Sequence, residues 1–582
     1  MRTWIFLILV LAVMACKTTT EDKEERFITL FETSNGKETP EYAEVMDFYK
    51  NLERSYPEIQ LRPMGETDSG LPLHIVTFNA DGVFSFEDLR EDKAVVLINN
   101  GIHPGESDGI DATMLLFRDL AEQKMAVPEN TVIVAIPVYN IGGALNRNSG
   151  SRANQNGPET YGFRGNARNY DLNRDFIKSD TKNARAFAGI FHLIRPDVFI
   201  DNHVSNGADY QYTLTHLFTQ HNKLGGVLGD YMHTEIMPKL EASLAEKNWD
   251  ITPYVNVFNR TPDAGFSQFM DYPRYSTGYT TLWNTLGLMV ETHMLKPYKK
   301  RVEGTYELMK SMIEIVEREG VKLKTLRAES HKAFTEAKTY PVQWVLDTTK
   351  TSSLLFKGYE GEYKTSEVTG MRRLYYDRNA PFTKEITYRN YYKPGAEIAI
   401  PGAYIIPQGW WNVVKLLETN RVEIKTLEKD TTITVEVYNI ESYETASSAY
   451  EGHYLHYNTK IAVTRESVLF KKGDYVIEVL QPSFRYILET LEPQAPDSFF
   501  NWNFFDTVLQ QKEGFSPYVF ETTAQKMLES DDSLRIEFEA KKENDSAFSG
   551  NWFAQLNWLY KKSVHYEKAH LRYPVYRIPK TQ

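Results

Sequence analysis

Short apolar runs that alternate with helical patterns constrain the fold of this chain more than any other feature of its sequence. Four runs have the length and apolar content of buried strands: 94–98, 132–136, 197–200 and 286–290. Helical patterns lie between them at 110–120 and 184–193, and a long charged helix is expected from Glu303 onward. Strands that alternate with helices predict the α/β class, with a mixed, largely parallel sheet flanked by helices.

The pattern changes after this long helix. Apolar residues alternate with polar ones at 433–437 and 475–479, which is typical of half-buried strands, and one amphipathic helix is expected at 410–417. The sequence therefore predicts a mostly-β region of one or two units over residues 340–582. The aromatic cluster at 499–505 fits a β core or a domain interface better than a surface that stacks on sugar or peptide.

The charge balance excludes one class of partner. The 582 residues include 66 Lys and Arg against 78 Asp and Glu, a formal net charge of −12. An acidic chain has no positive field to gather phosphates, so no nucleic-acid partner is expected. The hydrophobic content of 42% is that of an ordinary globular protein with a large core.

The N-terminal residues have the pattern of a secretory signal. An apolar run from Trp4 to Ala15 follows one early positive charge, and it is shorter than the about 20 residues that span a bilayer. Residues 13–16 resemble a bacterial lipobox, which predicts a signal peptide over 1–15 and lipidation of Cys16, the one cysteine. Residues 16–40 would be a polar tether, and the protein would be lipid-anchored at the bacterial cell envelope. The alternative is ordinary cleavage that leaves Cys16 free.

A candidate metal site follows two of the expected strands. His103 and Glu106 are three residues apart in the turn after the run 94–98, and His203 follows the run 197–200. Carboxyl ends of neighbouring parallel strands meet at the edge of a sheet where binding crevices form. Two histidines and one glutamate with an open fourth position is the pattern of a catalytic zinc site. Taken alone, His-x-x-Glu also occurs by chance in surface loops.

Other polar residues strengthen this interpretation. Glu291 ends the apolar run 286–290, where a carboxylate is costly to bury unless it is paired, linked to a metal or set to accept a proton. Asn173 and Arg174 lie in a polar loop, and a guanidinium binds a carboxylate with two hydrogen bonds. Arg164 lies ten residues before Arg174, although Arg152 competes with it in the same polar segment. His293 is interpreted as a residue that supports a ligand or simply packs beside the site, and not as a ligand itself.

Together these motifs resemble the carboxypeptidase A-like zinc metallocarboxypeptidases, over about residues 41–310. The bacterial secreted members share these stretches: His103–Glu106, Asn154–Pro158, Leu172–Asp175, and Asp201–His203 with Asn206–Tyr212 after it. The resemblance implies a carboxypeptidase-like (phosphorylase/hydrolase-type) fold and a catalytic domain over residues 41–325. It also implies hydrolysis of the C-terminal peptide bond of peptides with a free terminal carboxylate.

The resemblance also implies roles for individual residues. One Zn²⁺ would be held by His103, Glu106 and His203. Glu291 would be the general base for a zinc-activated water, and Arg164 would stabilise the oxyanion. Asn173 and Arg174 would bind the substrate carboxylate, and Asp171 would orient a ligand histidine. A tyrosine would also lie over the site. The candidates are Tyr272, Tyr275 and Tyr279, of which Tyr279 is preferred.

Two alternatives remain open at this point. The same zinc chemistry could act on peptidoglycan stem peptides or isopeptides, which an envelope location makes reasonable. A different class is a non-catalytic surface protein that binds glycan or peptide through its aromatic C-terminal region. Glu291 and Arg164 count against that class, because a protein that only binds has no use for a base.

Overall fold

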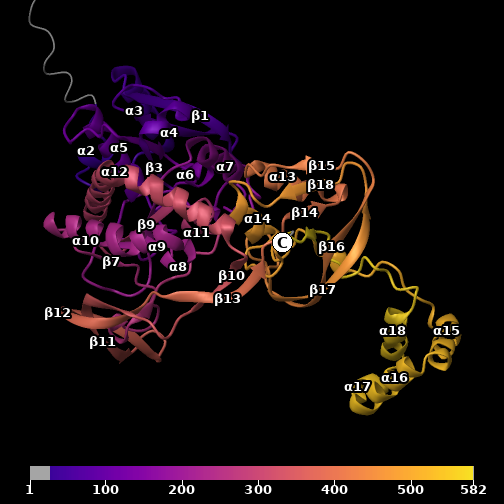
Figure 1. The fold of residues 1–582 in the computed structure, drawn as a ribbon. Helices are drawn as coiled ribbons and strands as arrows, with labels where there is room; N and C mark the ends of the chain where they lie inside the picture. The colour runs from indigo at the N-terminus through magenta and orange to yellow at the C-terminus, as the bar shows by residue number, and fades with distance from the viewer. Residues whose placement is uncertain (1–26, 581–582) are drawn as a thin grey trace, which may run out of the picture. The chain divides into compact units, whose positions relative to one another are not determined.

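The computed structural model describes residues 27–580 (Figure 1). The predicted signal peptide and Cys16 lie outside the described residues. The chain divides into two compact units. The first comprises residues up to Ile400 with Lys415–Glu423 and Leu480–Thr490, and the second comprises Pro401–Val414, Ile424–Val479 and Leu491–Gln582. Within residues 27–580, no helix is both long and apolar enough to cross a membrane.

An eight-stranded sheet is the framework of the first unit, in the order β1-β2-β4-β3-β5-β9-β6-β7. Its strands are β1 (Ile59–Glu66), β2 (Pro72–Phe78), β3 (Ala94–Asn99), β4 (Thr131–Ile136), β5 (Val198–Ser205), β6 (Leu214–Phe218), β7 (Ile251–Pro253) and β9 (Leu286–His293). The central strands β4, β3, β5 and β9 are parallel, whereas β1, β2 and β6 each pair antiparallel with a neighbour. The predicted mixed, largely parallel sheet is therefore confirmed.

Helices cover both faces of this sheet. The longer ones are α3 (Tyr42–Ser55), α5 (Asp108–Ala121), α7 (Lys182–Ile194), α10 (Met237–Glu246) and α12 (Tyr298–Glu336). The shorter ones are α2 (Leu30–Thr33), α4 (Phe86–Asp92), α6 (Ile141–Leu145), α8 (His221–Leu224), α9 (Gly226–Tyr231) and α11 (Ser276–Thr281). Ile200 of β5 joins the core under α5 and α12, whereas its neighbour Phe199 packs edge-on against Phe187 of α7. Because both of their faces are buried, the central strands β3 and β4 are continuously apolar rather than alternating.

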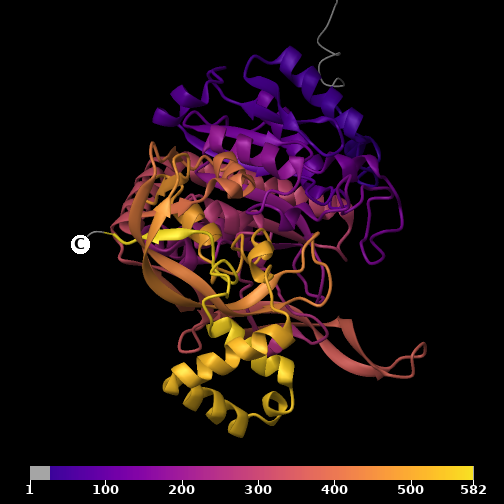
Figure 2. The same cartoon turned by 90° about the vertical axis from the view of Figure 1, so that its right-hand side faces the viewer.

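Two smaller sheets complete the first unit. Strands β10 (Thr339–Leu346) and β13 (Tyr392–Ala399) pair antiparallel, and β11 (Ser352–Thr365) pairs with β12 (Arg372–Arg389), which adds the short β8 (Phe266–Ser267). Figure 2 shows β11 and β12 as one long hairpin. These strands cluster with the first unit, so the division differs from the boundary near residue 340 that the change in pattern suggested. Long-range pairing, such as β12 with β8, leaves no local signal in the sequence.

The second unit is built on a six-stranded sheet, in the order β15-β18-β14-β19-β16-β17. Its strands are β14 (Ala403–Ile406), β15 (Lys425–Thr426), β16 (Thr431–Thr445), β17 (His456–Phe470), β18 (Tyr475–Glu478) and β19 (Tyr576–Ile578). Helices α13 (Trp411–Thr419) and α14 (Phe484–Leu491) have most of their residues in the first unit. Phe499, Phe500, Trp502 and Phe505 are fully buried, so the packing interpretation of the aromatic cluster is confirmed.

Four helices in the second unit are not predicted by the sequence pattern. They are α15 (Pro517–Ser530), α16 (Asp532–Asn544), α17 (Ser546–Ser549) and α18 (Trp552–Lys562), drawn in yellow in Figure 2. They share a small core of their own that includes Phe520, Phe538 and Leu559. The β-rich character predicted for the C-terminal region is confirmed, with this helical group added to it.

Asp111 makes the stability of the first unit depend on pH. This carboxyl group is fully buried in α5 and accepts hydrogen bonds from the hydroxyls of Thr39 and Tyr298. Burial raises its pKa to about 7, and the nearby Asp108 adds to the increase. Between about pH 4 and pH 7, Asp111 is therefore protonated in the folded state and ionised in the unfolded state. The stability that this proton contributes is present below pH 4 and is lost as the pH rises through 7.

We expect Asp111→Asn to stabilise the protein at pH 8, because a neutral amide removes the cost of a buried anion. The gain in unfolding free energy is expected to be at most about 4 kcal/mol, the value of three pKa units. Thermal unfolding of wild type and variant at pH 4.5 and pH 8 measures it. The unfolding temperatures should converge at the lower pH; a difference that is the same at both pH values would contradict this role of Asp111.

Candidate metal centre and active site

The ends of two adjacent parallel strands bring the candidate ligands together. β3 ends at Asn99, and the backbone then turns at Gly101, whose φ of +63° favours glycine. His103 and Glu106 follow in this turn, before α5 begins at Asp108. His203 lies on β5, the neighbour of β3, beyond the paired part of the two strands. The close approach therefore results from the parallel sheet and not from proximity in sequence.

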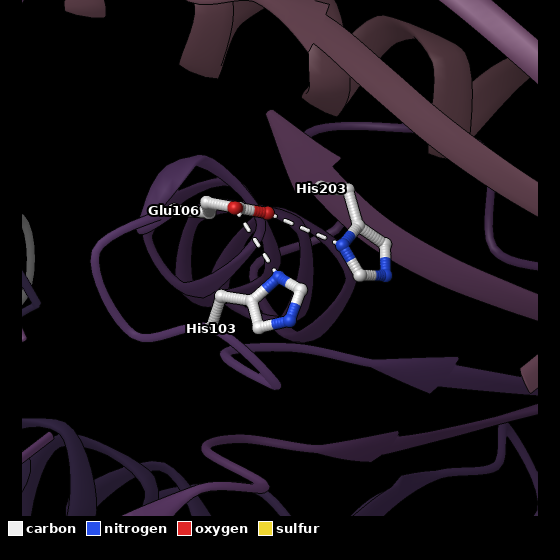
Figure 3. Close-up of side chains that lie close together, drawn as sticks. All are labelled: His103, Glu106 and His203. Carbon is white, nitrogen blue, oxygen red and sulfur yellow. Dashed lines mark hydrogen bonds and ion pairs between the residues drawn. The ribbon is translucent and has the colours of Figure 1, made fainter. Parts of the chain in front are cut away.

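The three side chains form a compact, buried cluster (Figure 3). Glu106 Oε1 lies 3.2 Å from His103 Nδ1, and Glu106 Oε2 lies 3.2 Å from His203 Nδ1. One potential ligand atom from each residue lies within 4.8 Å of the other two, and each side chain is only 3% exposed. Within residues 27–580, no other group of three or more His, Cys, Asp or Glu residues meets this condition.

The imidazole nitrogen that points away from Glu106 is hydrogen-bonded to an aspartate carboxylate in both histidines. His103 Nε2 lies 2.9 Å from Asp171 Oδ1, and His203 Nε2 lies 2.9 Å from Asp201 Oδ2. An aspartate accepts a hydrogen bond, so Nε2 of each ring is the donor to it, and Nδ1, the atom nearer to Glu106, is the nitrogen that can offer its lone pair to a metal ion. Carboxylate partners of this kind orient the histidine ligands of metal sites and raise their basicity. Two imidazole lone pairs and a carboxylate therefore fit a zinc ion.

The electrostatic field at the cluster favours a cation. Burial alone would lower the pKa of His203, but Asp201, Glu106 and Glu291 raise it well above its ordinary value. Burial likewise opposes ionisation of Glu106, yet the charges of His103 and Arg152 hold its pKa well below the ordinary value. A site that stabilises a proton on a buried imidazole in this way also stabilises a metal cation, because both bring positive charge into the same field.

Glu291 lies beside the cluster on β9. In the register of β5 and β9 it is paired with His203. Its Oε2 atom is inaccessible to solvent and has no hydrogen-bond partner among the described residues. Burial raises the pKa of Glu291 to about 8, and Glu106 and Asp201 add to the increase, whereas His203 and Arg164 oppose it. A carboxylate with one buried, unpartnered oxygen beside a metal-binding cluster is placed to accept a proton once a cation occupies the cluster, because nearby positive charge favours the ionised carboxylate.

Asp171 links the cluster to Arg164. The Nε and Nη2 atoms of Arg164 donate to Asp171 Oδ2 at 3.0 and 2.8 Å, and its Nη1 lies 3.6 Å from Glu106 Oε1. The Arg164 side chain is 45% exposed, so a substrate can reach it.

Asn173 and Arg174 lie in the adjoining 3₁₀ turn, Leu172–Arg174. Arg174 Nη1 donates to the carbonyl of Asn173 at 2.8 Å, and the guanidinium lies 4.6 Å from the ring centroid of Tyr275. The structure therefore places both predicted arginines, and Asn173 with them, beside the cluster.

The preference for Tyr279 is wrong. This side chain is fully buried and packs against Phe176, Phe187 and Phe191. Its hydroxyl donates to Asn420 Oδ1 at 2.7 Å, so it belongs to the core on the α7 side of the sheet. Sequence spacing cannot predict that Tyr279 is buried. The backbone path of α11 and of the loop before it decides which tyrosine points into the core.

Sequence reasoning missed Tyr254, which follows β7. Burial raises its pKa, and the carboxylates of Glu291 and Glu106 raise it further, whereas Arg174 opposes them. Tyr254 is therefore within electrostatic reach of the cluster. No motif surrounds it, and only the pairing of β6 with β7 and with β9 brings it near. His293, as expected, is no ligand: its Nε2 atom lies 3.2 Å from Asp209 Oδ1.

Comparison with known proteins agrees with this geometry. Residues 45–191 match the sequence model of the family described as Zinc carboxypeptidase. This match places a zinc carboxypeptidase domain over the part of the chain that carries His103, Glu106 and Asp171. Carboxypeptidase 2 from Trichophyton rubrum is 22% identical over 493 residues, which cover 80% of this chain and 84% of that protein. The protein is thus a zinc metallocarboxypeptidase, and His103, Glu106 and His203 are the group that can bind its zinc.

Solved structures with similarity to this zinc carboxypeptidase include two bacterial proteins. A putative carboxypeptidase A from Shewanella denitrificans OS-217 is 16% identical, with a TM-score of 0.34, and the match covers 47% of this chain and 69% of that one. A metallo-carboxypeptidase from Burkholderia cenocepacia is 16% identical, with a TM-score of 0.36 and coverage of 47% and 68%.

Proposed function

We propose that this zinc carboxypeptidase removes the C-terminal residue of peptides, with Glu291 as the general base. The observation that carries the proposal is the buried, unpartnered Oε2 of Glu291 beside the His103–Glu106–His203 cluster. Zinc held by these three residues supplies Lewis acidity, which lowers the pKa of water to about 7 and polarises the peptide carbonyl. Location at the cell envelope, with an anchor at Cys16, is part of the proposal and is supported by the apolar run Trp4–Ala15.

The chain's own residues account for the remaining chemistry. Glu291, which lies beside the cluster with Oε2 free of hydrogen bonds to the described residues, accepts the proton of the attacking water and passes it to the leaving amine. Arg164, exposed at the edge of the cluster and oriented by Asp171, stabilises the negative charge that develops on the carbonyl oxygen. A preorganised donor of this kind contributes on the order of 3–4 kcal/mol to transition-state stabilisation.

Arg174 and Asn173 are proposed to bind the free carboxylate of the substrate. The ring of Tyr275 and the carbonyl of Asn173 hold the guanidinium in place before the substrate arrives. A preorganised guanidinium loses little freedom when it forms two parallel hydrogen bonds to a carboxylate. A peptide with a blocked C-terminus would leave this charge without a partner, which is why the enzyme should act from the free end.

The test compares one peptide in two forms, with a free C-terminal carboxylate and with a C-terminal amide. We expect wild type to release a single C-terminal amino acid from the free acid and to hydrolyse the amide at least about 100-fold more slowly, since a site built to bind a charged group rejects its absence. Arg174→Gln should reduce kcat/KM for the free acid by about 100-fold and change hydrolysis of the amide little.

The matched control is Arg168→Gln, which changes an exposed arginine in the same loop. Mass analysis of the products gives the position of cleavage. Equal rates on the two forms, or cleavage at internal bonds, would contradict the proposal that the enzyme is an exopeptidase that binds the terminal carboxylate. Binding of the peptide with no turnover would support a non-catalytic surface protein instead.

A further inference from the structure

The segment Arg152–Pro158 lies against the metal cluster but contributes no ligand to it. Its backbone is tied to the end of β9, because the Asn156 N–H donates to the Met294 carbonyl at 2.8 Å. Gln155 Nε2 donates to the carbonyl of Gly105 at 2.8 Å. Gly105 directly precedes the ligand Glu106. The segment is therefore attached both to the strand that carries Glu291 and to the turn that carries two metal ligands.

Arg152 reaches the ligand Glu106 itself. Its Nη1 atom donates to Glu106 Oε1 at 2.9 Å, while its Nε atom donates to Gln155 Oε1 at 2.5 Å. The side chain is 15% exposed. Both contacts come from one planar guanidinium, a geometry that a lysine ammonium cannot reproduce.

The turn that carries the ligands leaves room for this guanidinium. A Cβ atom added at Gly105 would lie 2.6 Å from Arg152 Cδ and 3.0 Å from the Gly162 carbonyl oxygen. Any other residue at position 105 would therefore displace Arg152 or the turn. The glycine between the ligands His103 and Glu106 is explained by the close passage of Arg152.

A buried arginine holds the segment in place from the other side. Arg301 of α12 is fully buried and donates to the carbonyls of Gly157 and Asn156 at 2.8 and 3.3 Å. It also donates to Asp108 Oδ2 at 3.0 Å. Asp108 is the first residue of α5, two positions after Glu106, so the segment and the ligand turn share one anchor.

We propose that Arg152, oriented by Gln155, is a positioning residue that fixes the carboxylate of the zinc ligand Glu106. The inference rests on the zinc centre described above. Each oxygen of Glu106 has its own donor: Oε1 is held by Arg152, and Oε2 accepts from the backbone N–H of Val204 at 3.0 Å. With both oxygens held, the carboxylate keeps the orientation that faces the two imidazoles. Arg164, which is more exposed and bonded to Asp171, remains the residue that faces substrate.

Two effects of Arg152 on metal affinity have opposite signs. Its charge repels a divalent cation, whereas its hydrogen bond keeps the ligand oriented. Loss of a partner that orients a ligand typically weakens metal binding by about 10- to 100-fold. We expect orientation to dominate, because Glu106 is buried and its carboxylate has little access to solvent that could replace the lost donor.

The experiment measures zinc affinity directly, by competition of the apoprotein with a chromophoric chelator, without reference to activity. Arg152→Met keeps the length of the side chain and removes its donors, and it is expected to weaken zinc binding by about 10- to 100-fold. Arg152→Lys, which keeps the charge and can restore one hydrogen bond, should lie between Arg152→Met and wild type. The matched control is Arg168→Met, an exposed arginine that should leave the affinity unchanged.

Two further measurements keep the inference open to refutation. Gln155→Leu keeps Arg152 but removes the acceptor that orients it, together with the donor to the Gly105 carbonyl, and it should weaken zinc binding by several-fold, which provides a second test if Arg152→Met does not fold. The absorption spectrum of the cobalt(II)-substituted protein should change in Arg152→Met and stay unchanged in Arg168→Met. An affinity for Arg152→Met within threefold of wild type, or tighter, overturns the inference. Failure of wild type itself to bind zinc would overturn the zinc centre.

Discussion

Replacing Glu291 by glutamine is expected to lower kcat by about 10²- to 10⁴-fold, the range for removing a general base. The side chain keeps its size, so the loss reports the missing proton acceptor and not a cavity. The physical reason is the position of Glu291: Oε2 is buried without a hydrogen-bond partner among the described residues, and burial raises the pKa of the carboxyl to about 8. Steady-state hydrolysis of a peptide with a free C-terminus measures the effect.

Controls separate the loss of the base from the loss of the site. Glu291→Gln should retain zinc at the wild-type ratio, because Glu291 is not one of the three clustered ligands. Glu246→Gln, an exposed change at the end of α10, should have no effect on kcat. A Glu291→Gln protein that binds zinc and keeps more than a tenth of wild-type kcat would show that another group is the base.

Removal of zinc is expected to abolish activity and to destabilise the first unit. A ligand that binds only the folded state stabilises it by about 4 kcal/mol when its free concentration is 1,000 times its dissociation constant. The zinc-free centre leaves His103, Glu106 and His203 buried with no ion to bind. A chelator should therefore lower both the activity and the temperature of thermal unfolding, and added zinc should restore both.

A ligand variant shows whether the effect arises at this cluster. His203→Ala should bind zinc weakly, and its unfolding temperature should not respond to added zinc. His565→Ala changes an exposed histidine in the second unit and should respond as wild type does. If zinc stabilised His203→Ala as much as wild type, the stabilising ion would be bound elsewhere.

The parts of the site that depend on strand ends are predictable from the sequence. The apolar runs match the central strands within one or two residues, except that β5 extends through His203 to Ser205 and β9 through Glu291 to His293. In a parallel sheet, the residues that follow neighbouring strands have to meet at one edge. The expected sheet and the polar residues at its strand ends are therefore enough to place His103, Glu106, His203 and Glu291 together.

Residues on long connections cannot be placed in this way. Spacing favours Tyr279, but the core formed with Phe176 and Phe187 turns it inward. The sequence offers Arg152 only as a competitor of Arg164 and gives no signal for Tyr254, because both residues approach the site through segments whose paths are set by distant contacts, such as that of Arg301 with Gly157. The helices α15–α18 are likewise not predicted, because the alternating pattern of the neighbouring strands leads us to expect a mostly-β region.

The sequence by itself predicted the α/β framework and the polar residues that follow its apolar runs, because hydrophobic periodicity is a local property of the chain, and the resemblance to a known family gave His103, Glu106, His203 and Glu291 their roles. Tertiary structure alone decided which tyrosine is buried, which arginine is exposed beside the cluster and which donates a hydrogen bond to Glu106. These outcomes depend on packing between segments that are far apart in sequence, as in the contacts of Arg152 with Glu106 and of Arg301 with Gly157.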